Sequence, residues 1–162
     1  MTFAAFFAAL IALCSWLSLP VADIAFTMQT FGIFLALGLL GGKWGTVAIL
    51  IYLLLGAVGM PVFSGFRGGI GMLAGVTGGY LWGFLVSGLI YRAMERFGKF
   101  PAMVAGLLGC YLCGSLWFAL YSGGGLGFIF LRCVVPYLIP DGVKLYLAYA
   151  LSKRLIKYIP KV

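Results

Sequence analysis

The sequence predicts an all-α integral membrane protein with six transmembrane helices. Of its 162 residues, 64% are hydrophobic and 9% are charged, and the mean hydropathy is +1.17. So few charges could not cover the surface of a soluble protein. Six apolar segments, separated by glycine, proline or charged residues, each suit a helix that crosses a bilayer. We therefore expect a single membrane-embedded domain over residues 1–162.

The six segments lie near residues 3–19, 28–41, 45–60, 72–97, 101–121 and 138–158. No charged stretch precedes the first segment and no convincing small-residue cleavage site follows it, so we interpret it as a transmembrane helix rather than a signal peptide. The second and third segments are shorter than the about 20 residues that span a bilayer. We expect them to be tilted, broken or partly re-entrant, because irregular backbone in a membrane is tolerated only where it lines a cavity.

The distribution of charge predicts the orientation in the membrane. Eight basic residues lie between or at the ends of the segments on one side, namely Lys43, Arg92, Arg96, Lys99, Lys153, Arg154, Lys157 and Lys161. The opposite side holds only Arg67, Arg132 and Asp23. The positive-inside rule then places both termini in the cytoplasm and the loops near residues 20–27 and 61–71 outside the plasma (inner) membrane. The net charge of +8 therefore indicates topology and contact with the lipid bilayer rather than nucleic-acid binding.

The scarcity of reactive residues excludes most enzymatic chemistry. The chain has no histidine and three carboxylates, Asp23, Glu95 and Asp141, so it lacks the clustered ligands of a metal site. It also lacks the glycine-rich phosphate loop of ATPases, so energy for uphill transport must come from a partner or an ion gradient. The four cysteines lie in or beside apolar segments, where we interpret them as buried small hydrophobic residues. We expect neither enzyme activity nor a cofactor.

The first segment contains small residues at four-residue spacing in two overlapping frames. These residues are Ala4, Ala5, Ala8, Ala9 and Ala12. Such a pattern lets a second helix approach closely, since helix association in lipid depends on packing. Two interpretations stay open: packing within this chain, or docking on a separate membrane subunit.

Two opposite charges, Asp141 and Lys144, stand three residues apart at the start of the last segment. An ionisable residue at mid-bilayer costs about 2.5 to 3.5 kcal/mol on insertion scales, and less when it is paired. The presence of two such residues in an apolar segment therefore calls for an explanation. Pro140 suits the first position of a helix, which would put Asp141 in the first turn, where the helix dipole favours a negative charge. The spacing places both charges on one helix face. We expect this face to be one wall of a binding site for a small polar molecule; the alternative is an ion pair that only orients the last helix.

Further candidate residues lie in the glycine-rich stretch after the third segment. Residues 56–71 hold six glycines and one proline, which favours a tight loop whose backbone approaches a ligand or caps a cavity. Phe63 and Phe66 would supply apolar contact, and Arg67 could pair with a carboxylate. Arg67 could equally be an ordinary surface residue of an exterior loop.

Gln29, Thr77 and Tyr80 complete the candidate set. Gln29 stands at the mouth of the second segment with hydrogen-bonding groups to offer, and it could instead cap a neighbouring helix. Thr77 and Tyr80 are three residues apart near the start of the fourth segment and share a helix face. Tyr80 could line the pocket or belong to an aromatic belt at the membrane interface. The fifth segment, 101–121, indicates packing and little chemistry.

Four motifs spread over the chain carry a resemblance to a known family. They are Met60-Pro61-Val62-Phe63-Ser64-Gly65 with Gly68-Gly69, Thr77-Gly78-Gly79-Tyr80, Phe26-Thr27-Met28-Gln29-Thr30, and Pro140-Asp141-x-x-Lys144. Together they resemble the BioY family of biotin-specific substrate-binding subunits (S components) of energy-coupling-factor (ECF) transporters, and the resemblance covers nearly the whole chain in order. The family pattern usually has proline where this chain has Val76.

The resemblance implies a six-helix S-component fold that binds biotin at its exterior face. It implies two kinds of partner: a transmembrane coupling subunit and two ATP-hydrolysing subunits. By the same resemblance, Asp141 and Lys144 correspond to the family's ligand-contacting acid and base, and the alanine face of the first segment meets the coupling subunit. Biotin also fits the residues chemically, since Asp141 could accept ureido N–H groups and Lys144 or Arg67 could pair with the carboxylate.

Three other functions remain open from the sequence. The first is an S component for another small vitamin, which binding assays with biotin, thiamin and riboflavin would decide. The second is a membrane enzyme acting on lipid or isoprenoid substrates, although one accessible aspartate without histidine offers no evident acid–base pair. The third is a helical scaffold or channel, which would show no saturable binding of a small molecule.

Overall fold

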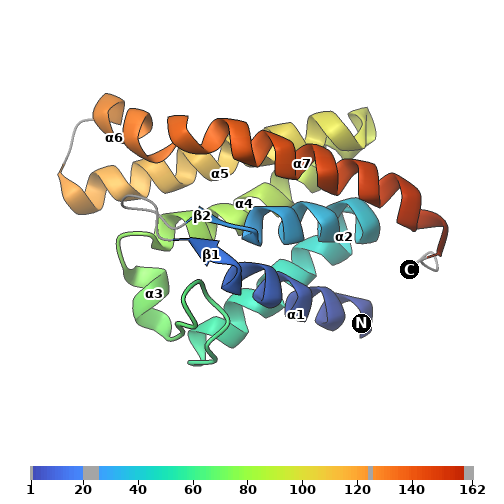
Figure 1. The fold of residues 1–162 in the computed structure, drawn as a ribbon, viewed down its shortest axis with the longest axis horizontal. Coiled ribbons are helices and arrows are strands. Elements are labelled where there is room, and N and C mark those ends of the chain that lie inside the picture. The colour runs from blue at the N-terminus through green and yellow to red at the C-terminus, as the bar shows by residue number, and fades with distance from the viewer. Residues whose placement is uncertain (1, 20–25, 124–125, 159–162) are drawn as a thin grey trace.

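The computed structural model describes residues 2–19, 26–123 and 126–158. Asp23 and Lys161, which entered the prediction of topology, lie outside these residues. The described elements are α1 (Thr2–Trp16), β1 (Ser18–Leu19), β2 (Phe26–Thr27), α2 (Gln29–Ala57), α3 (Ile70–Ala74), α4 (Gly78–Met94), η1 (Glu95–Phe97), α5 (Lys99–Ser122), α6 (Leu126–Cys133), α7 (Val135–Leu155) and η2 (Ile156–Tyr158). The two short strands pair antiparallel, with Ser18 opposite Thr27 (Figure 1).

Helix α2 contains both the second and the third predicted segments, joined at a break. Gly41 at the break has φ +76°, a left-handed conformation that glycine adopts without strain. The carboxylate of Glu95 accepts a hydrogen bond from the Gly42 N–H at 2.8 Å, and the Lys99 ammonium donates to the Gly38 carbonyl at 2.9 Å. These two side chains satisfy backbone groups that the break leaves without helical partners. A break is one of the three irregularities that the shortness of these two segments indicates, beside tilting and partial re-entry.

The described residues form seven α-helices rather than the six that the sequence predicted. The short helices α3 and α6 lie partly or wholly in predicted connections. The segment predicted over 72–97 is interrupted after α3, because Gly75 is extended (ψ −178°) and a Cβ at Gly78 would overlap the Leu73 backbone. Within the described residues, α2 and α5 are long and apolar enough to cross a membrane, and α1 is apolar but shorter.

Helix α2 packs against α1, α4 and α7, and α4 pairs closely with α5 (Figure 1). The close approach of α4 and α5 depends on glycine: a Cβ at Gly83 would lie 3.0 Å from the Cys110 carbonyl oxygen, and one at Gly106 would lie 3.0 Å from the Ser87 carbonyl oxygen. The Ser87 hydroxyl donates to the carbonyls of both glycines, at 2.9 and 2.8 Å. Close packing at small residues and interhelical hydrogen bonds are the contacts that usually stabilise helix association in lipid.

The alanines of α1 divide between two faces. Ala4, Ala8 and Ala12 are buried in the protein's own core, with exposed fractions of 2, 1 and 7%. They therefore pack within this chain, as one of the two interpretations held, and they are not available for docking on another subunit. Ala5 and Ala9 are exposed. The docking prediction consequently applies to these two residues alone.

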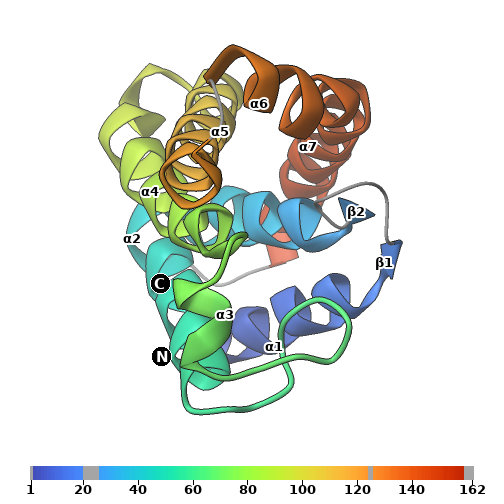
Figure 2. The same cartoon turned by 90° about the vertical axis from the view of Figure 1, so that its left-hand side faces the viewer.

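The first and last described residues lie at the same end of the molecule. Thr2 and Tyr158 border one cavity, and Figure 1 shows the start of α1 and the end of α7 close together. The strands, α3 and α6 lie at the opposite end, which faces the viewer in Figure 2.

Candidate functional site

A cavity of about 590 Å³ lies at the end of the molecule that is remote from the termini. Its walls come from the strands, the start of α2, the loop between α2 and α3, and parts of α4, α5, α6 and α7. All eight predicted binding residues border it: Gln29, Phe63, Phe66, Arg67, Thr77, Tyr80, Asp141 and Lys144. The structure thus brings together residues that are up to 115 positions apart in the sequence (144 − 29). Their role in binding a ligand stays a prediction.

Asp141 and Lys144 form a buried ion pair in the wall of this cavity. The Lys144 Nζ lies 2.8 Å from Asp141 Oδ1, and the two residues are 4% and 6% exposed. Their i, i+3 spacing on α7 puts them on one face, as predicted. The predicted start of the helix at Pro140 is wrong. Helix α7 begins at Val135, and Pro136 takes the early position instead, so Asp141 lies beyond the first turn and gains little from the helix dipole.

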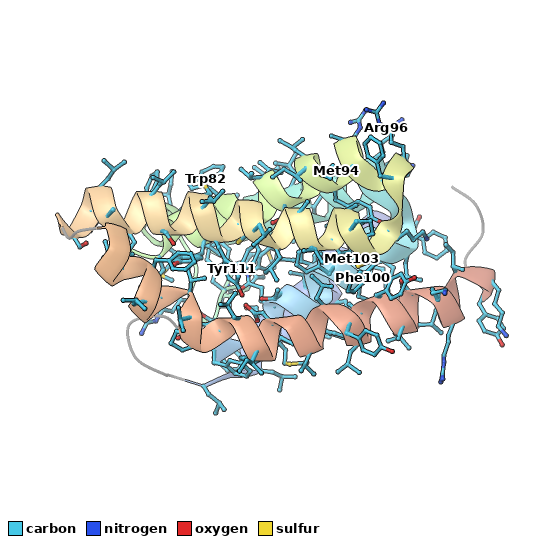
Figure 3. All side chains as sticks on the ribbon, turned by 90° about the horizontal axis from the view of Figure 1, so that it is seen from above. Trp82, Met94, Arg96, Phe100, Met103 and Tyr111 are labelled. Atoms are coloured by element: carbon cyan, nitrogen blue, oxygen red, sulfur yellow. The ribbon has the colours of Figure 1, made fainter. Side chains whose placement is uncertain are left out.

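Each member of the pair has further partners. The Lys144 ammonium donates to the Thr27 carbonyl at 2.7 Å and lies 3.7 Å from the centre of the Phe26 ring. The Tyr111 hydroxyl donates to Asp141 Oδ2 at 2.8 Å, and Figure 3 shows this tyrosine between α5 and α7. Both carboxylate oxygens are therefore hydrogen-bonded. Such a network offsets the desolvation of two charges, and it fixes the carboxylate in one orientation toward the cavity.

The loop between α2 and α3 closes one side of the cavity and is anchored to α1. The Trp16 indole N–H donates to the Pro61 carbonyl at 2.8 Å, and the Ser15 hydroxyl donates to the Val62 carbonyl at 2.7 Å. Phe66 stacks on the Trp16 ring with centroids 5.0 Å apart. The backbone of Phe66 is left-handed (φ +57°), a conformation that a bulky residue adopts only when its surroundings hold it. The stack on Trp16 and the two hydrogen bonds to the loop stabilise this backbone conformation of Phe66.

Phe63 borders the same cavity and is more deeply buried than Phe66. Its ring is buried, meets the Tyr52 ring edge to face at 5.5 Å, and lies so close to Gly56 that a Cβ there would overlap it. Its backbone pairs with that of Arg67, with the Phe63 N–H donating to the Arg67 carbonyl at 2.9 Å. Arg67 is exposed and borders the cavity, so it is both a surface residue and a residue of the rim.

The remaining predicted residues supply polar groups. The Gln29 amide donates to the hydroxyl of the fully buried Tyr52 at 2.9 Å, so it does not cap a neighbouring helix through this N–H. The Tyr80 side chain is half-buried in the cavity wall, and its hydroxyl, like that of Ser115, has no hydrogen-bond partner among the described residues. Thr77 borders the cavity just before α4 begins. Polar groups at Gln29, Tyr80 and Thr77 are thus spread around a largely apolar space.

Helix α5 contributes a wall that the sequence did not predict. Leu107, Cys110 and Tyr111 border the cavity, and the Tyr111 hydroxyl donates to Asp141, so this segment contributes to the cavity wall in addition to the packing that the sequence indicated. Their spacing of three and four residues is the signal of a shared helix face. Trp16 was also missed, because its contact with Phe66 joins residues 50 positions apart (66 − 16).

The cavity has the form of a site for a small organic molecule. Pockets of this kind are mostly apolar, with a few convergent polar groups that orient the ligand. Here the convergent groups are the Asp141–Lys144 pair, Gln29, Tyr80 and the rim residue Arg67. The described residues contain no group of three histidine, cysteine or acidic side chains that could hold a metal ion.

Comparisons of the sequence and of the fold with known proteins both find proteins named as biotin transporters or their S components. The model of the BioY family matches residues 1–161. A Biotin transporter BioY of Thermotoga maritima is 39% identical over 164 residues, which cover 95% of this chain and 94% of that protein. A Probable biotin transporter BioY of Pyrococcus horikoshii is 38% identical and covers 93% and 92%. The crystal structure of the S-component for biotin from an ECF-type ABC transporter superposes with a TM-score of 0.88 at 26% identity, covering 96% of this chain and 89% of that one.

Proposed function

Because this chain belongs to the BioY family, we propose that it captures biotin outside the cell and acts in its uptake as the substrate-binding subunit of an ECF-type ABC transporter. The observation that supports this most strongly is the cavity of about 590 Å³ with a buried acid–base pair in its wall. Charged residues buried in a membrane protein are costly and are usually retained for a function. The proposed role is binding and delivery, with no chemical step on the ligand.

Biotin matches the distribution of groups around the cavity. Its ureido ring has two N–H donors and one carbonyl acceptor, its sulfur ring is apolar, and its tail ends in a carboxylate. The ureido ring is neutral, so it suits the buried end, where Asp141 accepts its N–H groups and the Lys144 ammonium donates to its carbonyl. The carboxylate suits the exposed rim, where Arg67 supplies a charge, because burying an unpaired carboxylate is strongly unfavourable.

Aromatic residues enclose the apolar part of the ligand in this proposal. Phe63 and Tyr80 both border the cavity, and the stacked, partly exposed pair of Phe66 and Trp16 would cover its opening. A stacked pair at the opening would exclude water from the hydrogen bonds beneath it and so strengthen them. The Tyr80 ring borders the cavity, whereas its hydroxyl oxygen is buried without a hydrogen-bond partner among the described residues, so contact with the ligand would require this side chain to move.

The membrane arrangement in this proposal follows from the two arms of α2. Counting the arms separately, α1, both arms, α4, α5 and α7 give six crossings, with both termini on the side rich in basic residues, the cytoplasm. The cavity then opens outward. The transmembrane coupling subunit docks on the exposed small residues Ala5 and Ala9, and two ATPase subunits supply energy that this chain has no motif to generate.

The test is a comparison of protein purified from biotin-fed and biotin-starved cells. Mass spectrometry should find close to one biotin per chain in the first sample and much less in the second, and calorimetric titration of the second should show saturable binding. Thiamin and riboflavin serve as matched ligands. Binding of either in place of biotin would support an S component for another vitamin, and absence of all binding would support a scaffold or channel. Chemical turnover of the ligand would indicate an enzyme.

A further inference from the structure

A second cavity, of about 430 Å³, lies at the end of the molecule that holds Thr2 and Tyr158. It runs between α1, the first arm of α2 and the end of α7. The surface that borders it is entirely apolar, and its main contributors are Phe3, Phe6, Leu10, Leu39, Leu155 and Tyr158. Phe6 and Tyr158 are largely exposed, so the cavity is an open groove rather than an internal space. We refer to it below as the terminal groove.

A basic side chain, that of Lys157, lies beside one end of the terminal groove. The Lys157 ammonium lies 4.8 Å from the centre of the Tyr158 ring, and this ring borders the groove. Arg154 is exposed in the last turn of α7, just before the η2 turn that carries Tyr158. Among the described residues, this end of the molecule carries Lys43, Arg92, Arg96, Lys99, Lys153, Arg154 and Lys157. Its one described acid, Glu95, is engaged by the Gly42 N–H.

We propose that the terminal groove binds one acyl chain of an anionic phospholipid, whose headgroup is held by Arg154 and Lys157. The apolar lining suits a hydrocarbon chain, which needs no hydrogen bonds. The basic residues at its end suit a phosphate, since basic pockets between transmembrane helices bind anionic headgroups. Arginine adds two parallel N–H donors to a phosphate, and lysine adds a point charge.

The terminal groove is distinct from the face of α1 proposed for the coupling subunit. At about 100° per residue, the centre of the pair Ala5 and Ala9 lies about 110° around the helix from the centre of the side that carries Phe3, Phe6 and Leu10, and Ala9 lies about 60° from Phe6. Bulky side chains that leave a groove between them also differ from the small residues that close helix contacts favour. Lipid and partner can therefore occupy this helix together.

The experiment measures which lipid stays with the purified protein. Protein in detergent is mixed with equal amounts of phosphatidylglycerol and phosphatidylcholine, and native mass spectrometry counts the lipids bound. The parent chain should retain about one phosphatidylglycerol with little phosphatidylcholine. The Arg154→Gln/Lys157→Gln variant should lose at least about tenfold in phosphatidylglycerol retention, because each basic residue near the surface contributes roughly fivefold.

Two further variants make the test specific. Lys43→Gln/Arg96→Gln removes the same charge at the same end, away from the groove, and should retain the lipid within about twofold. Phe3→Ser/Phe6→Ser changes exposed lining residues, which limits the risk to folding, and should lower retention of both lipids. Gel filtration verifies that each variant is monodisperse. Biotin binding, measured on the same samples, should not change, so failure here would leave the proposed function untouched.

Three results would overturn the proposal. Equal loss of lipid in the two charge variants would show general attraction to the basic end. Lipid binding only after truncation beyond Tyr158 would show that the chain's own last residues fill the groove. Failure of all lipids to bind, together with loss of a co-purifying membrane subunit in Phe3→Ser/Phe6→Ser, would assign the groove to a protein partner.

Discussion

Replacing Lys144 by methionine should separate the structural role of the ion pair from its role in binding. Lys144→Met keeps an unbranched side chain that is one atom shorter, but it leaves the buried Asp141 carboxylate with Tyr111 as its remaining side-chain partner. Breaking a buried pair in this way costs about 3 to 5 kcal/mol. For a chain of this size, 3 kcal/mol corresponds to a fall in Tm of about 6 to 12 °C. Thermal unfolding of the parent chain and the variant in detergent measures this fall in Tm.

The double variant Asp141→Asn/Lys144→Met provides the decisive comparison. It removes both charges, so the unpaired carboxylate disappears and much of the lost Tm should return, because neutral replacements of a buried pair are often near neutral in stability. Biotin affinity should not return. Hydrogen bonds to charged groups contribute about 1.5 to 3 kcal/mol, so titration calorimetry should show biotin affinity lower by a factor of about 10 to 150.

The control for this cycle is Lys153→Met, which changes an exposed lysine on the same helix and should alter neither quantity. If the double variant recovers its stability and binds biotin within about threefold of the parent chain, less than about 1.4 kcal/mol, the pair is purely structural. The assignment of the site to Asp141 and Lys144 would then be refuted.

Three further predictions follow from single contacts. Tyr111→Phe removes the hydroxyl that orients Asp141 and should weaken biotin binding by about 10-fold or more in calorimetry, whereas Tyr121→Phe, exposed on the same helix, should not; equal affinities would contradict the role given to Tyr111. Gly56→Ala should lower Tm and biotin affinity together, because the new methyl group displaces the Phe63 ring by overpacking worth about 1 to 3 kcal/mol; an unchanged melting curve would count against the packing described. Gly41→Ala should destabilise by about 1 to 3 kcal/mol, because the backbone of residue 41 (φ +76°, ψ 173°) lies in a region that is essentially restricted to glycine, while biotin affinity stays unchanged; a selective loss of binding would link the break to the distant site.

Much of the candidate site could be predicted because polar residues are rare in this chain. Asp141 and Lys144 stand out against an apolar background, and their spacing alone places them on one face. The glycine-rich stretch 56–71 predicted a tight loop, and the structure has one there, anchored through Trp16. In a membrane protein, residues with an energetic cost are few, so each of them is informative.

Other features depend on contacts that no local pattern contains. Tyr111 looks like one more large residue in an apolar helix, and only the packing of α5 against α7 brings its hydroxyl to Asp141. The start of α7 was misplaced because Pro136 and Pro140 both suit an early helical position, and neighbouring residues decide between them.

The break in α2 shows both the strength and the limit of the sequence. The short segments predicted an irregularity near residues 41–45, and Gly41 allows it. The groups that stabilise it, Glu95 and Lys99, come from a turn more than 50 positions away in the sequence (95 − 41). Periodicity and propensity describe near neighbours, so such distant partners could not be identified before the fold was known.

A structure of the protein with biotin bound would test the central claim most directly. The account predicts biotin in the cavity of about 590 Å³, with its ureido nitrogens within about 3.2 Å of Asp141 and its carboxylate near Arg67 at the rim. Biotin bound at another place, or bound in this cavity without contact to Asp141 and Lys144, would contradict it.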